Sequence, residues 1–185
     1  MDDKARLKRQ LVYLTGFMGS GKSTIGPILA NTLGFEYVDV DKLIEEMSNK
    51  RIVDIFGEEG EQSFRAMERA ALERLMTREH CVVSLGGGTI ANEQNFQLIH
   101  GSGIVIYLQL SPEEILERVR HRSDRPLLRD AAGNPLTPPQ LEQKVKDMLG
   151  MRSQFYSRAD IIIPSDSKRV GHTVDEIVRR LRGYV

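Results

Sequence analysis

The sequence predicts an α/β fold in which one parallel sheet is covered by helices on both faces. Short apolar segments alternate with amphipathic segments along nearly the whole chain, a pattern typical of βαβ units with right-handed crossovers. The first apolar segment runs directly into a glycine-rich loop at residues 16–21 and then into a helix-like segment. The 185 residues suit one domain with a sizeable core, and we expect residues 1–185 to form it.

The spacing of apolar residues places the strands and helices of this fold. We expect strands at residues 11–15, 35–40, 81–85, 104–108 and 161–163. We expect helices at residues 21–33, from 41, at 52–57, from 60, at 92–99, at 111–122, after 139 and at 174–181. Ser111, Pro112 and Glu114 form a capping signal at the start of one of them. Pro27 lies inside the first helix, where it removes a backbone donor, so we expect a local irregularity there.

Composition narrows the kind of protein. Lys+Arg and Asp+Glu are both 26, so the net charge is zero, which argues against a nucleic-acid or polybasic membrane surface. No apolar run approaches the ~20 residues of a membrane span, and the first residues lack the apolar core of a signal peptide. Cys81 is the only cysteine and lies in an apolar stretch, so we expect a buried, inert thiol. We expect a cytoplasmic monomer without nucleic-acid or membrane partners.

The loop after the first predicted strand has the spacing of a phosphate-binding P-loop: Gly16, four residues, then Gly21-Lys22-Ser23. Its glycines let backbone N–H groups approach phosphate oxygens, and the helix that follows adds the positive end of its dipole. Lys22 can contact the β- and γ-phosphates of a nucleotide, and the Ser23 hydroxyl can ligate Mg²⁺. The residues predicted to contact the phosphates are Gly19, Ser20, Gly21, Lys22, Ser23 and Thr24.

Asp39 and Asp41 stand two residues apart at the end of a predicted strand. Side chains two apart on an extended backbone point the same way. If this strand lies beside the first, both carboxylates reach the crevice at the carboxyl ends of the strands, where the P-loop also sits. One could hold water ligands of Mg²⁺, and the other could accept the proton of an attacking hydroxyl. The alternative is a solvated pair at a helix start, with one aspartate acting as the N-cap.

Gly86, Gly87 and Gly88 directly follow the third predicted strand. Three glycines in a row are unfavourable in backbone entropy, and they suit a place where a ligand approaches the main chain closely. A plain tight turn is the alternative.

Two arginines on distant helices suggest a second, anionic ligand. Arg152 falls on the apolar stripe of its helix, where an arginine is unfavourable unless it meets an anion. Arg65 lies near the start of another helix, with Glu68 one turn on as an orienting partner. If the two converge on one pocket they suit a carboxylate, because the guanidinium fork matches it in bidentate geometry. Structural salt bridges are the alternative.

Residues 123–139 contain four of the seven prolines and have neither helical nor strand periodicity. Such a stretch predicts a mobile lid at about 123–139. Several arginines crowd just before and within it, and some of them can form a solvated charged face. Arg125, which precedes Pro126, is the one we expect to reach the transferring phosphoryl group when the lid closes.

Together these features resemble the shikimate kinase family over nearly the whole chain. The matching pieces are the motif at residues 16–24, Asp39-Val40-Asp41, Phe64-Arg65 with Glu68, Gly86-Gly87-Gly88, Arg125-Pro126-Leu127-Leu128, and Arg152 with Tyr156. The resemblance implies a three-layer αβα P-loop kinase fold, like that of nucleoside monophosphate kinases. Its five-stranded parallel sheet would have the order 2-3-1-4-5, with a substrate-binding region at about residues 40–76. It also implies Mg²⁺- and ATP-dependent phosphorylation of the 3-hydroxyl of shikimate, on the route to chorismate and the aromatic amino acids.

The resemblance also assigns roles to residues. The catalytic residues would be Lys22, Asp41 and Arg125. The metal ligands would be Ser23 and Asp39. The shikimate-binding residues would be Asp41, Arg65, Gly86, Gly87, Gly88 and Arg152. Besides the P-loop and Arg125, either Arg118 or Arg122 would contact the adenine of ATP, and the loop at about 165–170 would lie against it.

Three alternatives remain beside this resemblance. A gluconate kinase and a nucleoside monophosphate kinase share the fold and the P-loop. The pair Arg65 and Arg152 with the triple glycine favours a small carboxylated polyol, and the ordered set of motifs favours shikimate over gluconate. The third alternative is a kinase-like binding protein without catalysis, although every predicted catalytic position is filled.

Overall fold

The structure is a computed structural model that describes residues 11–120, 128, 134–165 and 169–184. It contains a five-stranded sheet in the order β2-β3-β1-β4-β5. The strands are β1 (Leu11–Thr15), β2 (Glu36–Asp39), β3 (Cys81–Ser84), β4 (Ile104–Gln109) and β5 (Ile161–Pro164). All neighbouring pairs are parallel, with Leu11 opposite Cys81 and Val12 opposite Ile104. The predicted sheet and the strand order implied by the resemblance are confirmed.

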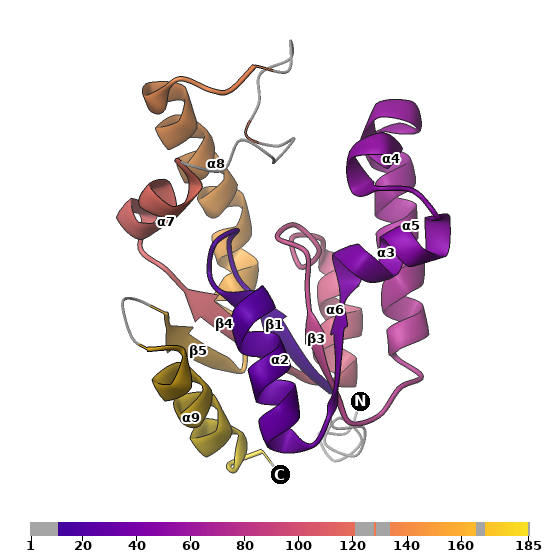
Figure 1. Cartoon of the computed structure of the whole chain (residues 1–185), viewed down its shortest axis with the longest axis vertical. Helices are drawn as coiled ribbons and strands as arrows, with labels where there is room; N and C mark the ends of the chain where they lie inside the picture. The colour runs from indigo at the N-terminus through magenta and orange to yellow at the C-terminus, as the bar shows by residue number, and fades with distance from the viewer. Residues whose placement is uncertain (1–10, 121–127, 129–133, 166–168, 185) are drawn as a thin grey trace.

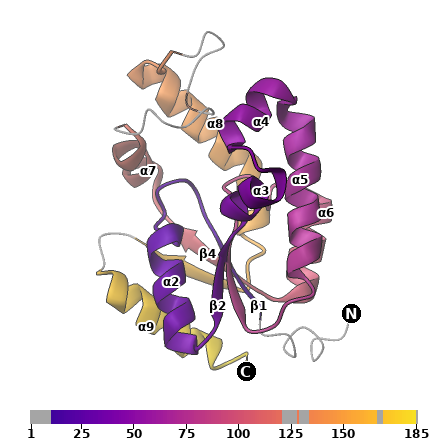
Figure 2. The same cartoon turned by 45° about the vertical axis from the view of Figure 1, so that its right-hand side comes forward.

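Helices cover both faces of this sheet and make the three layers visible in Figures 1 and 2. The helices are α2 (Lys22–Leu33), α3 (Val40–Ser48), α4 (Ile52–Glu58), α5 (Gly60–Leu75), α6 (Glu93–Ser102), α7 (Pro112–Val119), α8 (Pro138–Tyr156) and α9 (Val170–Leu181). Helices α2 and α9 pack on one face, and α5 and α6 on the other. At the carboxyl ends of the strands, α7 and α8 stand to one side of the loop after β1, and α3 and α4 to the other (Figure 1).

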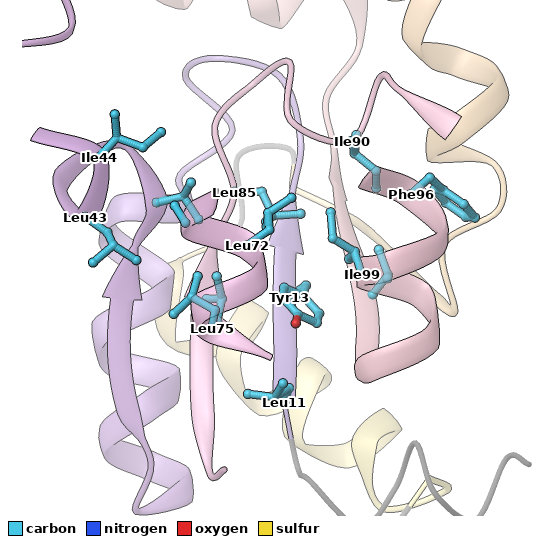
Figure 3. Close-up of a cluster of buried hydrophobic side chains, with 14 of the residues drawn as sticks. Leu11, Tyr13, Leu43, Ile44, Leu72, Leu75, Leu85, Ile90, Phe96 and Ile99 are labelled. Carbon is cyan, nitrogen blue, oxygen red and sulfur yellow. The ribbon is translucent and has the colours of Figure 1, made fainter. Parts of the chain in front are cut away.

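The core is apolar on both sides of β1, whose five residues are all buried. On one side Tyr13 lies among leucines of α5 and side chains of α6 such as Phe96 (Figure 3). On the other side Leu14 packs with Leu29 of α2 and Ile177 of α9. A strand buried on both faces has no polar alternation, which is why its sequence reads as a continuous apolar run.

The backbone at the aspartate pair differs from the prediction. Helix α3 begins at Val40, so Asp39 is its N-cap and its Oδ1 accepts a hydrogen bond from the Asp41 N–H at 3.0 Å. The pair therefore does not share an extended strand. Nor does β2 lie beside β1, because β3 stands between them. The prediction of a common extended geometry was wrong, and the N-cap alternative is correct for Asp39.

The region of the predicted lid is only partly described. Helix α8 begins at Pro138, so the last two residues of the predicted segment 123–139 are helical, and proline suits the first helical positions. The Thr137 N–H donates to Gln140 Oε1 at 2.9 Å, which caps this start. Both Arg122 and Arg125 lie outside the described residues. Helix α7 ends at Val119, short of the predicted 122, and α9 starts at Val170, one turn earlier than predicted.

Helix α2 runs through Pro27 without interruption. The bond that a proline removes at this place is the one to the carbonyl of Ser23, in the first turn of the helix. The missing bond thus lies near the helix start, and the predicted irregularity does not break the helix. The helix ends at Leu33, and the capping residue Gly34 adopts the left-handed conformation at φ 69°.

Two expectations from composition can be compared with the structure. The Cys81 side chain is fully buried, and burial raises the pKa of its thiol to about 11. The thiol is therefore protonated at neutral pH and unreactive, as predicted. In the part of the chain that the structure describes, no helix combines the length and the apolar character that crossing a membrane requires.

Candidate active site

The loop after β1 has the backbone conformation that a P-loop needs. Gly16, Gly19 and Gly21 have φ angles of 150°, 84° and 93°, a region that residues with a Cβ rarely adopt. Lys22 folds back over the loop, and its Nζ donates to the carbonyl oxygens of Gly16 at 2.7 Å and Phe17 at 3.2 Å. The lysine is therefore held at the loop, beside the start of α2, where a phosphate would bind.

A cavity of about 370 Å³ lies over this loop. Its lining includes all the P-loop residues predicted to contact the phosphates, from 19 to 24, together with Asp39, Asp41, Arg118 and Ser165. Arg118 donates from Nη1 to the Gly19 carbonyl at 2.9 Å and from Nη2 to the Ser165 carbonyl at 3.3 Å. It thereby joins the P-loop to the segment after β5. Arg118, one of the two arginines that the resemblance left open for the adenine, lines this cavity, and Arg122 lies outside the described residues.

A second cavity, of about 540 Å³, adjoins the first. Ser23, Asp39 and Asp41 line both cavities, so they lie where the two meet. The second cavity is also lined by Arg65 and Arg152, which come from α5 and α8. From the sequence we expected these side chains, which come from four separate segments, to form one site. The structure brings them together around this cavity.

The triple glycine connects β3 to the region before α6, and each of its members is close to a different predicted substrate-binding side chain. A Cβ on Gly86 would lie 2.7 Å from Asp41 Oδ1. A Cβ on Gly87 would lie 3.4 Å from Arg152 Nη1, and one on Gly88 would lie 3.2 Å from Arg65 Nη1. A side chain at position 86 would therefore displace Asp41 or Thr89, one at 88 would crowd Arg65, and one at 87 would just touch Arg152. None of the three has a positive φ.

Arg152 carries a charge in a buried place. Its exposed fraction is 6%, and its Nη1 has no hydrogen-bond partner among the described residues. Its Cζ lies 5.3 Å from the centre of the Phe17 ring, so the P-loop covers part of the guanidinium. A buried charged donor without a partner is unfavourable in free energy. An anion in the second cavity would supply the missing partner.

Arg65 is held by two carboxylates of its own helix. Its Nη1 donates to Glu68 and its Nη2 to Glu61, both at 3.0 Å. Glu68 is buried, and its other oxygen accepts from Thr89 Oγ1 at 2.6 Å. Burial alone would lower the pKa of Arg65, but the Glu68 and Glu61 carboxylates raise it overall. Arg65 is therefore a fixed cation, and Glu68 is the orienting partner that the sequence predicted.

Phe17 and Thr89, which contact the predicted site residues, were not themselves predicted. Phe17, inside the P-loop, packs on Arg152, and Thr89, directly after the glycines, fixes Glu68. Thr89 could have been suspected because it follows the glycine run. Phe17 occupies a variable position of the motif, and its contact with a helix far along the chain leaves no local signal in the sequence.

The fold and these two cavities define a P-loop kinase that acts on a small acceptor with an anionic group. One cavity has the lysine, the glycine loop and the helix start of a P-loop, and the other is lined by two arginines and an aspartate. A family model described as "Shikimate kinase" matches residues 18–182. The chain belongs to the shikimate kinase family, as its motifs indicated.

The relatives agree with this assignment. The chain is 46% identical to the shikimate kinase of Chlorobaculum parvum over 95% of this chain and 94% of that protein. Among solved structures, the shikimate kinase of Acinetobacter baumannii in complex with shikimate has a TM-score of 0.84 at 33% identity and covers 98% of both chains. A gluconokinase from Sinorhizobium meliloti has a TM-score of 0.57 at 18% identity over 95% of this chain and 93% of that one, which shows a shared fold alone.

Proposed function

We propose that this chain transfers the γ-phosphoryl group of ATP to the 3-hydroxyl of shikimate, with Mg²⁺, and releases ADP and shikimate 3-phosphate. The observation that carries the proposal is the glycine loop at residues 86–88. There Asp41, Arg152 and Arg65 each approach a different glycine beside the P-loop. An acceptor that bears a carboxylate and hydroxyl groups matches a site with two arginines and one aspartate. The A. baumannii relative was solved in complex with shikimate.

The residues present suit Mg²⁺. Mg²⁺ is usually held by one or two carboxylates together with waters and substrate phosphates. Ser23 and Asp39 line the junction of the two cavities and supply a hydroxyl and a carboxylate. Among the described residues, no group of three or more His, Cys, Asp or Glu side chains gathers as a metal cage. A metal that depends on phosphate oxygens for the rest of its ligands fits this arrangement, and when bound it neutralises phosphate charge.

The side chains of the site have separate roles in the proposed reaction. Lys22 and the loop amides stabilise the charge on the transferring phosphoryl group. Arg65 and Arg152 bind the shikimate carboxylate and so fix the orientation of the ring. Asp41 accepts a hydrogen bond from the reacting hydroxyl and takes its proton as the new P–O bond forms. Positioning and charge neutralisation supply most of the rate increase in reactions of this kind.

Three further parts of the proposal come from the sequence. Arg125 stays a predicted contact of the transferring phosphoryl group. The segment at about 123–139 stays a predicted lid apart from its last two residues, which belong to α8, and its closure would exclude water from the site. We also propose that the protein is a cytoplasmic monomer with a single kinase domain. The buried, protonated thiol of its one cysteine is compatible with a reducing compartment.

Replacement of Asp41 tests its role as proton acceptor. Asp41→Asn preserves the shape of the side chain and removes the charge, and we expect kcat to fall about 100-fold. The KM for ATP should change little, since Lys22 and the loop amides remain. Steady-state kinetics with both substrates measure the effect, and thermal unfolding shows whether the variant folds. A kcat equal to that of the unchanged protein would remove Asp41 from the reaction.

The identity of the acceptor is tested by comparing the three candidate substrates in separate reactions. The protein is incubated with Mg²⁺ and ATP and, separately, with shikimate, gluconate or AMP, and ADP release is followed. We expect turnover above the substrate-free control with shikimate only. ADP release with gluconate or AMP but not with shikimate would refute the proposed function and favour one of the two related kinases.

A further inference from the structure

Tyr37 contacts one of the two proposed metal ligands. It lies two residues before Asp39 on β2, and side chains two apart on a strand share a face of the sheet. Its hydroxyl donates to Asp39 Oδ2 across 3.4 Å. The other oxygen of that carboxylate, Oδ1, accepts from the Asp41 N–H at 3.0 Å. Both oxygens of the Asp39 carboxylate are thus oriented by the chain itself.

The ring of Tyr37 is fixed against the helix that carries the other proposed ligand. A Cβ on Gly26 would overlap Cε2 of the ring and would lie 3.1 Å from Cδ2. Gly26 is in α2, three residues after Ser23 and therefore on the adjoining turn of the helix. The absence of a side chain at Gly26 makes room for the ring. Tyr37 thereby bridges the start of α2 and the Asp39 carboxylate.

The Tyr37 hydroxyl stays a donor at neutral pH. The phenol of a tyrosine has an ordinary pKa of about 10, so its hydroxyl carries a proton at neutral pH. A protonated phenol can only donate toward a carboxylate, so the contact with Asp39 has a defined direction.

We infer that Tyr37 is a positioning residue of the metal site, whose hydroxyl orients the Asp39 carboxylate toward the Mg²⁺ that Asp39 and Ser23 hold. The inference rests on the proposed function and deepens it. Groups that hydrogen-bond to a metal-binding carboxylate set its orientation and tune the affinity for the metal. A separation of 3.4 Å is long for an O–H···O bond. Contacts of this kind often tighten once the ligand is bound.

The variant Tyr37→Phe isolates the hydroxyl, because the ring against Gly26 is kept. The Mg²⁺ concentration that gives half-maximal activity should rise about 10-fold, as is typical when such a partner of a metal-binding group is removed. The KM for shikimate should stay unchanged, since the arginines are untouched. A second measurement needs no turnover: calorimetry of ADP binding with Mg²⁺ and with EDTA. The gain in ADP affinity that Mg²⁺ brings should shrink by a similar factor, with the affinity in EDTA unchanged.

Two further variants separate this effect from a general loss of packing. Tyr13→Phe is the matched control, because it also removes a tyrosine hydroxyl with a partner inside the protein; this one contacts Ser102 at 2.8 Å in the core. It should leave the Mg²⁺ dependence unchanged. Gly26→Ala displaces the Tyr37 ring and should weaken the Mg²⁺ effect when the hydroxyl is present. In the Tyr37→Phe background, Gly26→Ala should weaken it no further, which a double-mutant cycle measures.

The outcome of Asp39→Asn shows which claim fails if Tyr37→Phe behaves like the unchanged protein. A normal Mg²⁺ effect in Tyr37→Phe, with a reduced one in Asp39→Asn, overturns the role of Tyr37 and leaves the metal site intact. A normal Mg²⁺ effect in both variants would refute the proposal that Asp39 holds Mg²⁺, and with it the role of Tyr37. An equal loss in Tyr37→Phe and Tyr13→Phe would also overturn the inference, since it would mark a general effect of losing a buried hydroxyl.

Discussion

Lys22→Ala is expected to lower kcat about 1,000-fold, the upper range for removal of one preorganised group that stabilises transition-state charge. In the structure the Lys22 ammonium is held by the carbonyl oxygens of Gly16 and Phe17, so it is in place before a nucleotide arrives. The loop amides and the helix start are kept in the variant. ATP should therefore still bind, and the loss should appear mainly in kcat.

Two comparisons make the Lys22 result specific. Lys146→Ala is the matched control, because this lysine pairs with Glu142 on the exposed side of α8 and lies outside both cavities. It should leave kcat unchanged. Thermal unfolding of Lys22→Ala shows whether the variant stays folded once the carbonyl oxygens of Gly16 and Phe17 lose this donor. A kcat within a few-fold of normal would contradict the assignment of the phosphate site.

Arg152→Ala is expected to raise the KM for shikimate about 100-fold. The buried Nη1 has no partner among the described residues and faces the triple glycine, so a bound carboxylate would complete its hydrogen bonds. A hydrogen bond to a charged group is worth about 1.5–3 kcal/mol, which corresponds to roughly 10- to 150-fold in affinity. The KM for ATP should stay close to normal, because the residues proposed to bind the phosphates line the cavity over the P-loop, which Arg152 does not line.

The Arg152 variant also removes packing over Phe17, which a second variant controls for. Arg152→Met keeps an apolar stem against the ring and removes the charge. It should reproduce the rise in the KM for shikimate. Arg158→Ala is the matched arginine control, since Arg158 pairs with Glu93, packs on Phe96 and lies outside the substrate cavity. An unchanged KM in Arg152→Met would exclude Arg152 from carboxylate binding.

The fold could be predicted from the sequence because its strands and helices carry strong local patterns. Strand β1 is a continuous apolar run since both of its faces are buried, and Ser111 caps α7 in the predicted capping box. The aspartate pair shows the limit of such patterns. Whether Val40 continues a strand or begins a helix depends on the cap, in which the Asp39 side chain accepts a hydrogen bond from the Asp41 N–H. Both carboxylates line the predicted site, but from the start of a helix and not from the end of an extended strand.

The charged residues of the candidate site could be predicted from the sequence. The contacts that hold them in place could not. Arg152 was recognisable because an arginine on an apolar stripe needs an explanation, and it is buried beside the P-loop. Tyr37 and Phe17 carry no such signal. An aromatic residue in a strand or loop is ordinary, and its role depends on neighbours that only the tertiary structure brings near. The neighbour of Tyr37 is Gly26, and that of Phe17 is Arg152.

The central claim is that this site phosphorylates the 3-hydroxyl of shikimate. Correlated ³¹P and ¹H NMR of the reaction with shikimate, ATP and Mg²⁺ tests it most directly. The account predicts one new phosphate ester whose phosphorus couples to the proton on carbon 3, with ADP formed in equal amount. An ester at another hydroxyl, or ADP and free phosphate without any ester, would contradict it.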